Sequence, residues 1–105
     1  MDETINDIIR NFRTKTGCRV IPKIHCKDGF SISVQASEGH YCYPRLNVGP
    51  WVEFELGFPS EADDLIMEYI DDREMDPTKT VYGYVPIDVV NKLIAKHGGI
   101  VKKEE

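Results

Sequence analysis

The sequence lacks the features of several large protein classes. With 13 Lys and Arg against 18 Asp and Glu, the formal net charge is -5, so no basic excess points to nucleic-acid binding. No apolar run approaches the roughly 20 residues that cross a bilayer, which argues against a membrane partner. The three cysteines are an odd number without framework spacing, which argues against a secreted disulfide scaffold.

What is present is typical of one small globular domain. The 105 residues leave room for a single domain, predicted over 1–105, and 41% hydrophobic residues are enough for a core. Asp2, Glu3 and Asp7 near the start are unlike a signal peptide, which opens with basic and apolar residues. We therefore expect a cytoplasmic protein.

Three segments have the apolar spacing of a helix. Residues 5–12 place isoleucines and a phenylalanine at i, i+3, i+4 and i+7, and Gly17 can end this helix. Residues 62–70 follow a Pro-Ser start and carry acids on the face opposite their apolar stripe. The third helix is predicted to open at Pro86 and to end at Gly98-Gly99.

Alternating apolar and polar residues predict a hairpin over 20–26 and 30–36. Two loop lengths are possible between these strands. A two-residue loop would pair core residues with charged ones. A three-residue loop with Gly29 in the left-handed conformation pairs Ile24 with Ile32 and keeps one face apolar. We expect the three-residue loop.

Further extended segments complete the predicted sheet. Residues 51–56 alternate cleanly, with Val52 as the first inward side chain, and shorter strands are expected over 40–43 and 81–85. Strands in a run, flanked by helices, predict the α+β class. We expect an antiparallel sheet of about four strands with helices packed on one face.

The face opposite the helices is a candidate recognition surface. It is predicted to display polar side chains around one tryptophan, namely Lys23, His25, Ser31, Ser33, Gln35, Trp51, Glu53 and Glu55. Either Tyr41 and Tyr43 or His40 and Cys42 join them. Aromatic residues among hydrogen-bonding groups are typical of binding surfaces. The plainer interpretation is that an antiparallel sheet keeps one face wet.

Metal binding is the most specific chemical alternative to a recognition surface. His25, His40 and Cys42 are residue types that bind zinc, although no CxxC pair accompanies them. The competing interpretation is that the cysteines pack as small hydrophobes and the histidines bond to hydroxyls. Nucleophilic catalysis by Cys42 with His25, or acid–base catalysis by Glu53 and Glu55, has no further support in the sequence. We therefore expect neither an enzyme nor a cofactor.

Charge is concentrated in residues 61–76. Eight acids and one arginine give this segment a net charge of -7, which leaves +2 for the rest of the chain. Such acidity favours a basic partner, or merely solubility, and the candidate contacts are Asp64, Glu68, Asp71 and Asp72. Arg45 is a candidate anion ligand in a loop. His97 is interpreted as complementing the dipole of the last helix.

Several segments together resemble small uncharacterised proteins encoded in phage and prophage genomes. They read IHCKDGFSISVQAS at 24–37, HYCYPR at 40–45, GFPSE at 57–61 and VYGYVP at 81–86. The resemblance carries no catalytic motif. It implies an accessory binding protein in the host-cell cytoplasm that inhibits a bacterial defence system, by binding an effector protein or by sequestering a signalling nucleotide.

Two versions of this binding hypothesis differ in their residues. In the first, the acidic helix engages a basic groove on a host defence protein. In the second, Trp51 or Tyr43 stacks on the base of a small nucleotide, while Lys23 and Arg45 meet its phosphate. In both we expect a homodimer or higher oligomer that does not bind nucleic acid directly.

Overall fold

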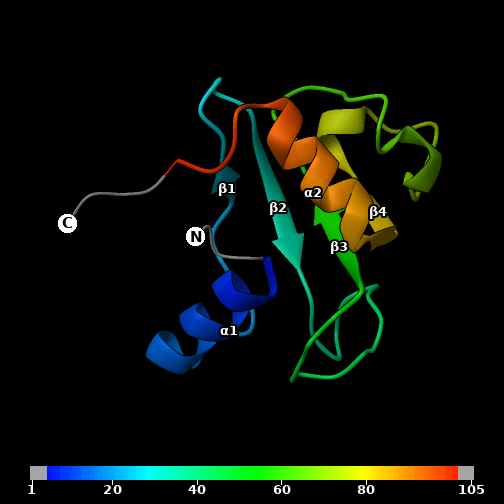
Figure 1. The fold of residues 1–105 in the computed structure, drawn as a ribbon. Coiled ribbons are helices and arrows are strands. Elements are labelled where there is room, and N and C mark those ends of the chain that lie inside the picture. The colour runs from blue at the N-terminus through cyan, green and yellow to red at the C-terminus, as the bar shows by residue number, and fades with distance from the viewer. Residues whose placement is uncertain (1–4, 102–105) are drawn as a thin grey trace.

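The computed structural model describes residues 5–101, so the acidic start at Asp2 and Glu3 lies outside the described residues. Its centre is a four-stranded antiparallel sheet in the order β1-β2-β3-β4, and α2 lies across one face (Figure 1). The predicted α+β class is confirmed. The elements are α1 (Ile5–Thr16), β1 (Ile24–His25), β2 (Ser31–Gln35), β3 (Glu53–Gly57), the 3-10 turns η1 (Met67–Tyr69) and η2 (Pro77–Lys79), β4 (Val81–Pro86) and α2 (Ile87–Lys96).

Both α-helices bury the apolar stripe that the sequence predicts. α1 buries Ile9 and ends before Gly17, which has a φ of 73°. α2 begins after Pro86, buries Leu93 and is followed by Gly98-Gly99, with φ angles of 93° and 89°. These left-handed residues stop each helix where a side chain would be strained. Within residues 5–101, neither helix has the length and apolar character needed to cross a membrane.

The hairpin of β1 and β2 has the predicted register. Ile24 lies opposite Ile32, and His25 lies opposite Ser31. Gly29 has a φ of 98°, which confirms the three-residue loop. Since a shift by one residue would reverse every side chain, this register places Ile24 in the core and His25 in solvent.

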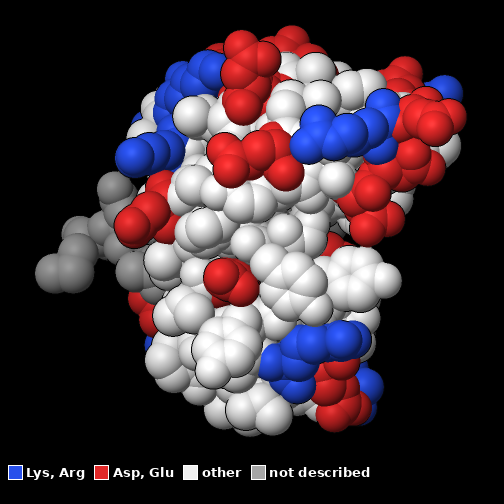
Figure 2. Space-filling model, turned by 90° about the vertical axis from the view of Figure 1, so that its right-hand side faces the viewer, with Lys and Arg blue, Asp and Glu red and all other residues white. Residues whose placement is uncertain are grey.

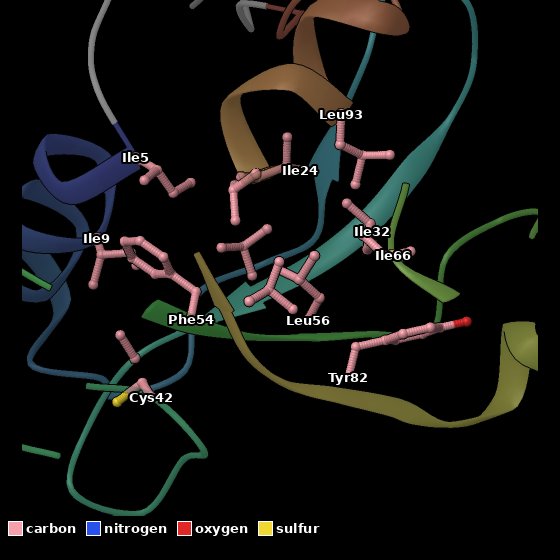
Figure 3. Packing of buried hydrophobic residues seen from close by; sticks show 14 of the residues in the cluster. Ile5, Ile9, Ile24, Ile32, Cys42, Phe54, Leu56, Ile66, Tyr82 and Leu93 are labelled. Atoms are coloured by element: carbon pink, nitrogen blue, oxygen red, sulfur yellow. The ribbon is translucent and has the colours of Figure 1, made fainter. Parts of the chain in front are cut away.

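The hydrophobic core lies between the sheet and the helices. In Figure 3, Ile5 and Ile9 of α1 and Leu93 of α2 point toward Phe54 and Leu56 of β3. All five side chains are at most 2% exposed. Burial of an aliphatic or aromatic side chain of this size contributes about 1.5–3 kcal/mol, so this contact supplies the main stabilisation of the fold.

The helix predicted over 62–70 is wrong. Only the 3-10 turn η1 forms there, and Ile70 makes a β-bridge with Tyr82 of β4. The carboxylate of Asp63 accepts a hydrogen bond from the Leu65 amide at 3.0 Å. A local side-chain bond of this kind competes with helical hydrogen bonds, and the bridge to β4 then holds the segment extended.

Three strand predictions also need correction. Of the strand predicted over 20–26, only β1 at Ile24–His25 forms. Residues 40–43 do not form a strand; Tyr43 makes only an isolated bridge with Glu53. β3 begins at Glu53 rather than at Trp51, so Val52, predicted to face inward, is 51% exposed. The side-chain alternation predicted for this segment holds only where the chain is paired on the sheet.

Candidate functional site

Four side chains gather where the loop over 40–45 meets β3 and β4, and we call them the tyrosine face: Tyr41, Tyr43, Arg45 and Tyr84. Tyr43 is 62% exposed, and Tyr41 and Tyr84 are 43% and 44% exposed. The ring centres of Tyr41 and Tyr84 are 6.0 Å apart, and the guanidinium carbon of Arg45 lies 5.8 Å from the Tyr41 ring centre. In Figure 2, aromatic side chains and a basic group adjoin in the lower half of the view.

Backbone hydrogen bonds hold the tyrosine face in place. The Tyr43 amide donates to the Glu53 carbonyl at 3.1 Å, and the Glu53 amide donates back to Tyr43 at 3.2 Å. The Tyr84 amide donates to the Tyr41 carbonyl at 2.9 Å. The Tyr41 amide donates to Oε2 of Glu55 at 3.1 Å. The tyrosines are therefore exposed while the backbone that carries them is fixed to the sheet.

Tyr84 adopts a conformation that is unfavourable for its residue type. Its φ is 53°, in the left-handed region, next to an irregularity in the pairing of β3 with β4. A side chain with a Cβ in this region costs roughly 1–2 kcal/mol. The neighbouring Gly83 leaves little room, because a Cβ there would lie 3.3 Å from the Cβ of Tyr41. In this unfavourable backbone conformation the Tyr84 side chain is 44% exposed to solvent.

The prediction that Trp51 lies on the exposed recognition surface is wrong. Trp51 is 2% exposed, and its indole Nε1 donates to the Leu46 carbonyl at 3.0 Å. Asn6 of α1 bonds both its backbone amide and its carbonyl, at 2.7 and 3.0 Å. The guanidinium of Arg13 lies 5.0 Å from the ring centre. Trp51 therefore joins the loop before β3 to α1. The alternation of side chains on the sheet does not apply to it, because β3 begins only at Glu53.

The other predicted residues of the sheet face are only partly brought together. His25 and Lys23 are exposed, and Nζ of Lys23 donates to the Phe58 carbonyl at 2.8 Å. Glu53 and Glu55 are half-buried beside the tyrosine face. Gln35, predicted to be displayed, is 5% exposed and bonds the backbone of Ile21. Since Gln35 satisfies backbone groups inside the fold, it is not available to a ligand.

The four acidic residues predicted as partner contacts are all exposed: Asp64, Glu68, Asp71 and Asp72. They lie on turns rather than on the face of a helix, because 62–70 is not helical. In Figure 2, acidic side chains cover much of the upper right of the molecule.

The candidate zinc ligands have other partners. Nδ1 of His40 lies 2.6 Å from the Ser37 hydroxyl, and burial lowers the His40 pKa. Cys42 is buried and donates to the Ser37 carbonyl at 3.2 Å, and burial raises its pKa. These contacts match the plainer interpretation for His40 and Cys42. Within residues 5–101, no three His, Cys, Asp or Glu side chains are grouped so as to hold a metal ion; the zinc alternative stays a prediction.

The sequence interpretation of His97 missed a buried charge cluster. His97 is 5% exposed, and its ring stacks on Phe30 with 3.9 Å between centroids. Nδ1 lies 2.7 Å from Asp28 Oδ2, and Nε2 lies 2.8 Å from Asp63 Oδ2. Nζ of Lys96 is 3.0 Å from the same Asp63 oxygen. Because an ionised carboxylate only accepts, two carboxylate partners favour the imidazolium form, in which both ring nitrogens donate.

The pKa values in this cluster follow from its hydrogen bonds. Burial by itself lowers the pKa of His97, but the bonds to Asp28 and Asp63 raise it above its usual value. Burial raises the pKa of Asp63, but donation from Leu65, His97 and Lys96 holds it below its usual value. The Phe30 amide, and then His97, lower the pKa of Asp28. The cluster joins the hairpin turn, the 63–65 turn and the end of α2, so it ties three separate segments together.

A groove of about 580 Å³ lies between α1 and the loop over 47–51. The side chains along it are engaged within the chain. Arg10 pairs with Asp7 at 2.7 Å, Asn6 bonds the backbone amide and carbonyl of Trp51, and Arg13 donates to three backbone carbonyls. Of these three side chains, only Arg13 keeps a buried polar atom without a partner among the described residues, its Nε. The groove therefore offers fewer free groups for recognition than the tyrosine face.

Comparisons with protein-family models, with curated proteins and with solved structures found no match for this chain.

Proposed function

We propose that this chain is a non-enzymatic binding protein that docks a protein partner on its tyrosine face. The observation that carries the proposal is the set of three exposed tyrosine rings on a backbone fixed to β3 and β4. Rigid aromatic side chains provide contact area at a low cost in conformational entropy, and tyrosine is enriched among the residues that dominate binding energy. The strained backbone at Tyr84 supports the same conclusion, since strain of this kind clusters at functional sites.

A protein partner fits these residues better than a nucleotide does. A nucleotide trap needs a free aromatic ring beside free cations. Trp51 is buried under Arg13, and Lys23 is engaged with the Phe58 carbonyl. Arg45 lies over the Tyr41 ring. A broad, exposed aromatic surface is instead typical of protein interfaces.

We further propose that the partner belongs to a bacterial defence system, which this protein inhibits by occupying it. This part of the proposal rests on the resemblance to phage and prophage proteins. The absence of catalysis is part of the same proposal. It is supported by the raised pKa of Cys42, which disfavours the thiolate that nucleophilic catalysis needs.

The experiment compares three forms of the chain as bait in lysates of bacteria that carry defined defence systems. The forms are wild type, Tyr43→Ala and a matched control, Val20→Ala. Val20 is 59% exposed, close to the 62% of Tyr43, but lies outside the tyrosine face. We expect one protein to be captured by wild type and control and to fall about tenfold with Tyr43→Ala.

A plating assay then measures phage growth on cells that carry the captured defence protein. Wild type and Val20→Ala should restore phage growth, and Tyr43→Ala should not. Circular dichroism shows whether the variants are folded. Equal capture by a folded Tyr43→Ala protein would refute the tyrosine face as the binding site. Capture that depends on Tyr43 without any effect on phage growth would refute only the role in defence.

A further inference from the structure

The tyrosine face and the exposed acids adjoin along one strand, β4. Tyr84 of the tyrosine face lies on this strand. On the same strand, Tyr82 makes a bridge with Ile70, and the Asp71 amide donates to the Val81 carbonyl at 2.9 Å. The chain after Ile70 therefore runs beside β4. We call the exposed acids on both sides of Ile70, namely Glu68, Asp71, Asp72 and Glu74, the acidic edge.

No side chain of the acidic edge forms an ion pair with another residue of the described part of the chain. Among residues 5–101, the ion pairs of the 61–76 segment involve only Asp63, which is bonded by Lys96 and His97. Arg73 is the single base in the segment. A field of one sign next to an aromatic surface attracts a partner of the opposite sign and excludes one of the same sign.

The chemistry of the tyrosine face fits a guanidinium group. Arg45 already lies over the Tyr41 ring, and Glu55 is hydrogen-bonded beside it, so ring and carboxylate lie close together. An arginine that lies on a tyrosine ring gains a cation–π contact and can also donate to a carboxylate. Tyr43 is the most exposed ring of the face and has no aromatic or cationic contact among the described residues.

We infer that the partner presents an arginine-bearing basic segment that contacts the tyrosine face and the acidic edge together. This inference rests on the function proposed above and names the chemistry of the partner. A second copy of the chain is a poorer occupant, because each copy carries a net charge of -5 and two acidic edges would oppose each other. The acids and the aromatic residues are far apart in sequence and belong to separate hypotheses there; β4 brings them into one surface.

The test is an NMR titration of the full chain with a short arginine–glycine peptide. A lysine–glycine peptide of equal length and charge is the control for plain electrostatic attraction. We expect the arginine peptide to shift signals of both the tyrosine face and the acidic edge. Tyr84→Gly, which relieves the left-handed strain and so should fold, is expected to weaken binding roughly threefold to tenfold, as is Tyr43→Ala.

The acidic edge is tested separately with the double variant Glu68→Gln and Asp71→Asn. It should weaken peptide binding by about the same factor, and an increase of salt from about 0.05 to 0.5 M should weaken wild-type binding further. Val20→Ala should bind as wild type does. Signals that shift only at the acidic edge, or equal binding of the lysine peptide, would overturn the inference.

Sedimentation distinguishes the rival occupant. A dimer that becomes a monomer with Tyr43→Ala would show that a second copy covers the tyrosine face, and this also overturns the inference. The proposed function fails on different grounds. If a partner is captured through Tyr43 but its retention does not change with salt, the basic segment is wrong while the binding function stands. If capture does not depend on Tyr43, both are wrong.

Discussion

Replacement of His97 by glutamine should expose how much the fold depends on its buried charge cluster. Glutamine has a similar size but cannot donate from two ring positions, so one of Asp28 and Asp63 loses its hydrogen bond. Stacking on Phe30 is lost as well. Asp63, at 5% exposed, would then keep only Lys96 as a charged partner.

The expected loss in the free energy of unfolding is about 3 kcal/mol, the lower end of the range for removing one partner of a buried ion pair. The lower end applies because Lys96 still faces Asp63, and because the side chain of Asp28 is 49% exposed and can bond to water. A domain of this size has a total stability of about 5–15 kcal/mol, so the variant should remain folded but lose a large part of that stability.

Urea denaturation followed by tryptophan fluorescence measures the loss, with His25→Gln as the matched control. His25 is an exposed histidine on β1, and its replacement should change stability by less than about 0.5 kcal/mol. A loss below about 1 kcal/mol for His97→Gln would refute the argument that the cluster carries buried charge.

The pH dependence of the unfolding free energy gives a second measure of the His97 cluster, and the pKa shifts fix its sign. The pKa of His97 is raised in the folded state, so its contribution is complete below its ordinary value of 6.5 and is lost as pH rises through the folded pKa. The pKa values of Asp28 and Asp63 are lowered, so their contribution is lost as pH falls below 3.8. The stability gap between wild type and His97→Gln should therefore be widest between these limits and narrow toward about pH 8.5.

The quantity to follow is the difference in unfolding free energy between wild type and His97→Gln. His40 has a lowered pKa, so its effect on the pH dependence of stability is opposite to that of His97, but it is the same in both proteins and cancels in the difference. A gap that stays constant between about pH 5.5 and 8.5 would contradict an imidazolium held by two carboxylates.

Three further predictions concern stability and metal content. Trp51→Ala removes the one tryptophan, so its urea denaturation is followed by circular dichroism. It should cost about 4 kcal/mol, because the side chain is 2% exposed; a loss below about 1 kcal/mol would contradict its place in the core. Tyr82→Ala should cost about as much, because Tyr82 is fully buried. Tyr84→Gly should change stability by less than about 1 kcal/mol, since relief of the left-handed backbone offsets the lost contact with Tyr41. A larger loss for Tyr84→Gly than for Tyr82→Ala would contradict the burial of Tyr82 and the exposure of Tyr84. Elemental analysis should find less than about a tenth of an equivalent of zinc, and a full equivalent would favour the zinc alternative.

The parts of the fold that could be predicted are those decided by neighbours in the chain. The hairpin register followed from a three-residue loop and from the need to keep Ile24 and Ile32 on one face. The stops of both helices followed from Gly17 and Gly98-Gly99. In each case the deciding residues lie within a few positions of one another, so sequence spacing carries the information.

The candidate site was predicted in part. Tyr41, Tyr43 and Arg45 were named from the sequence, and the structure places them together. Tyr84 was not named as a site residue, because its display depends on an irregular pairing of β3 with β4. Trp51 was placed on the wrong side, since alternation was extended past the point where β3 begins.

The sequence by itself determined the α+β class, the hairpin and the concentration of acids, because periodicity, turn chemistry and composition are local properties of the chain. Only the tertiary structure decided that Trp51 is buried against α1, since its partner Asn6 is 45 residues away. The same holds for His97, whose carboxylate partners lie 69 and 34 residues away in sequence. No spacing rule links such residues; they meet because the sheet and α2 bring distant segments together.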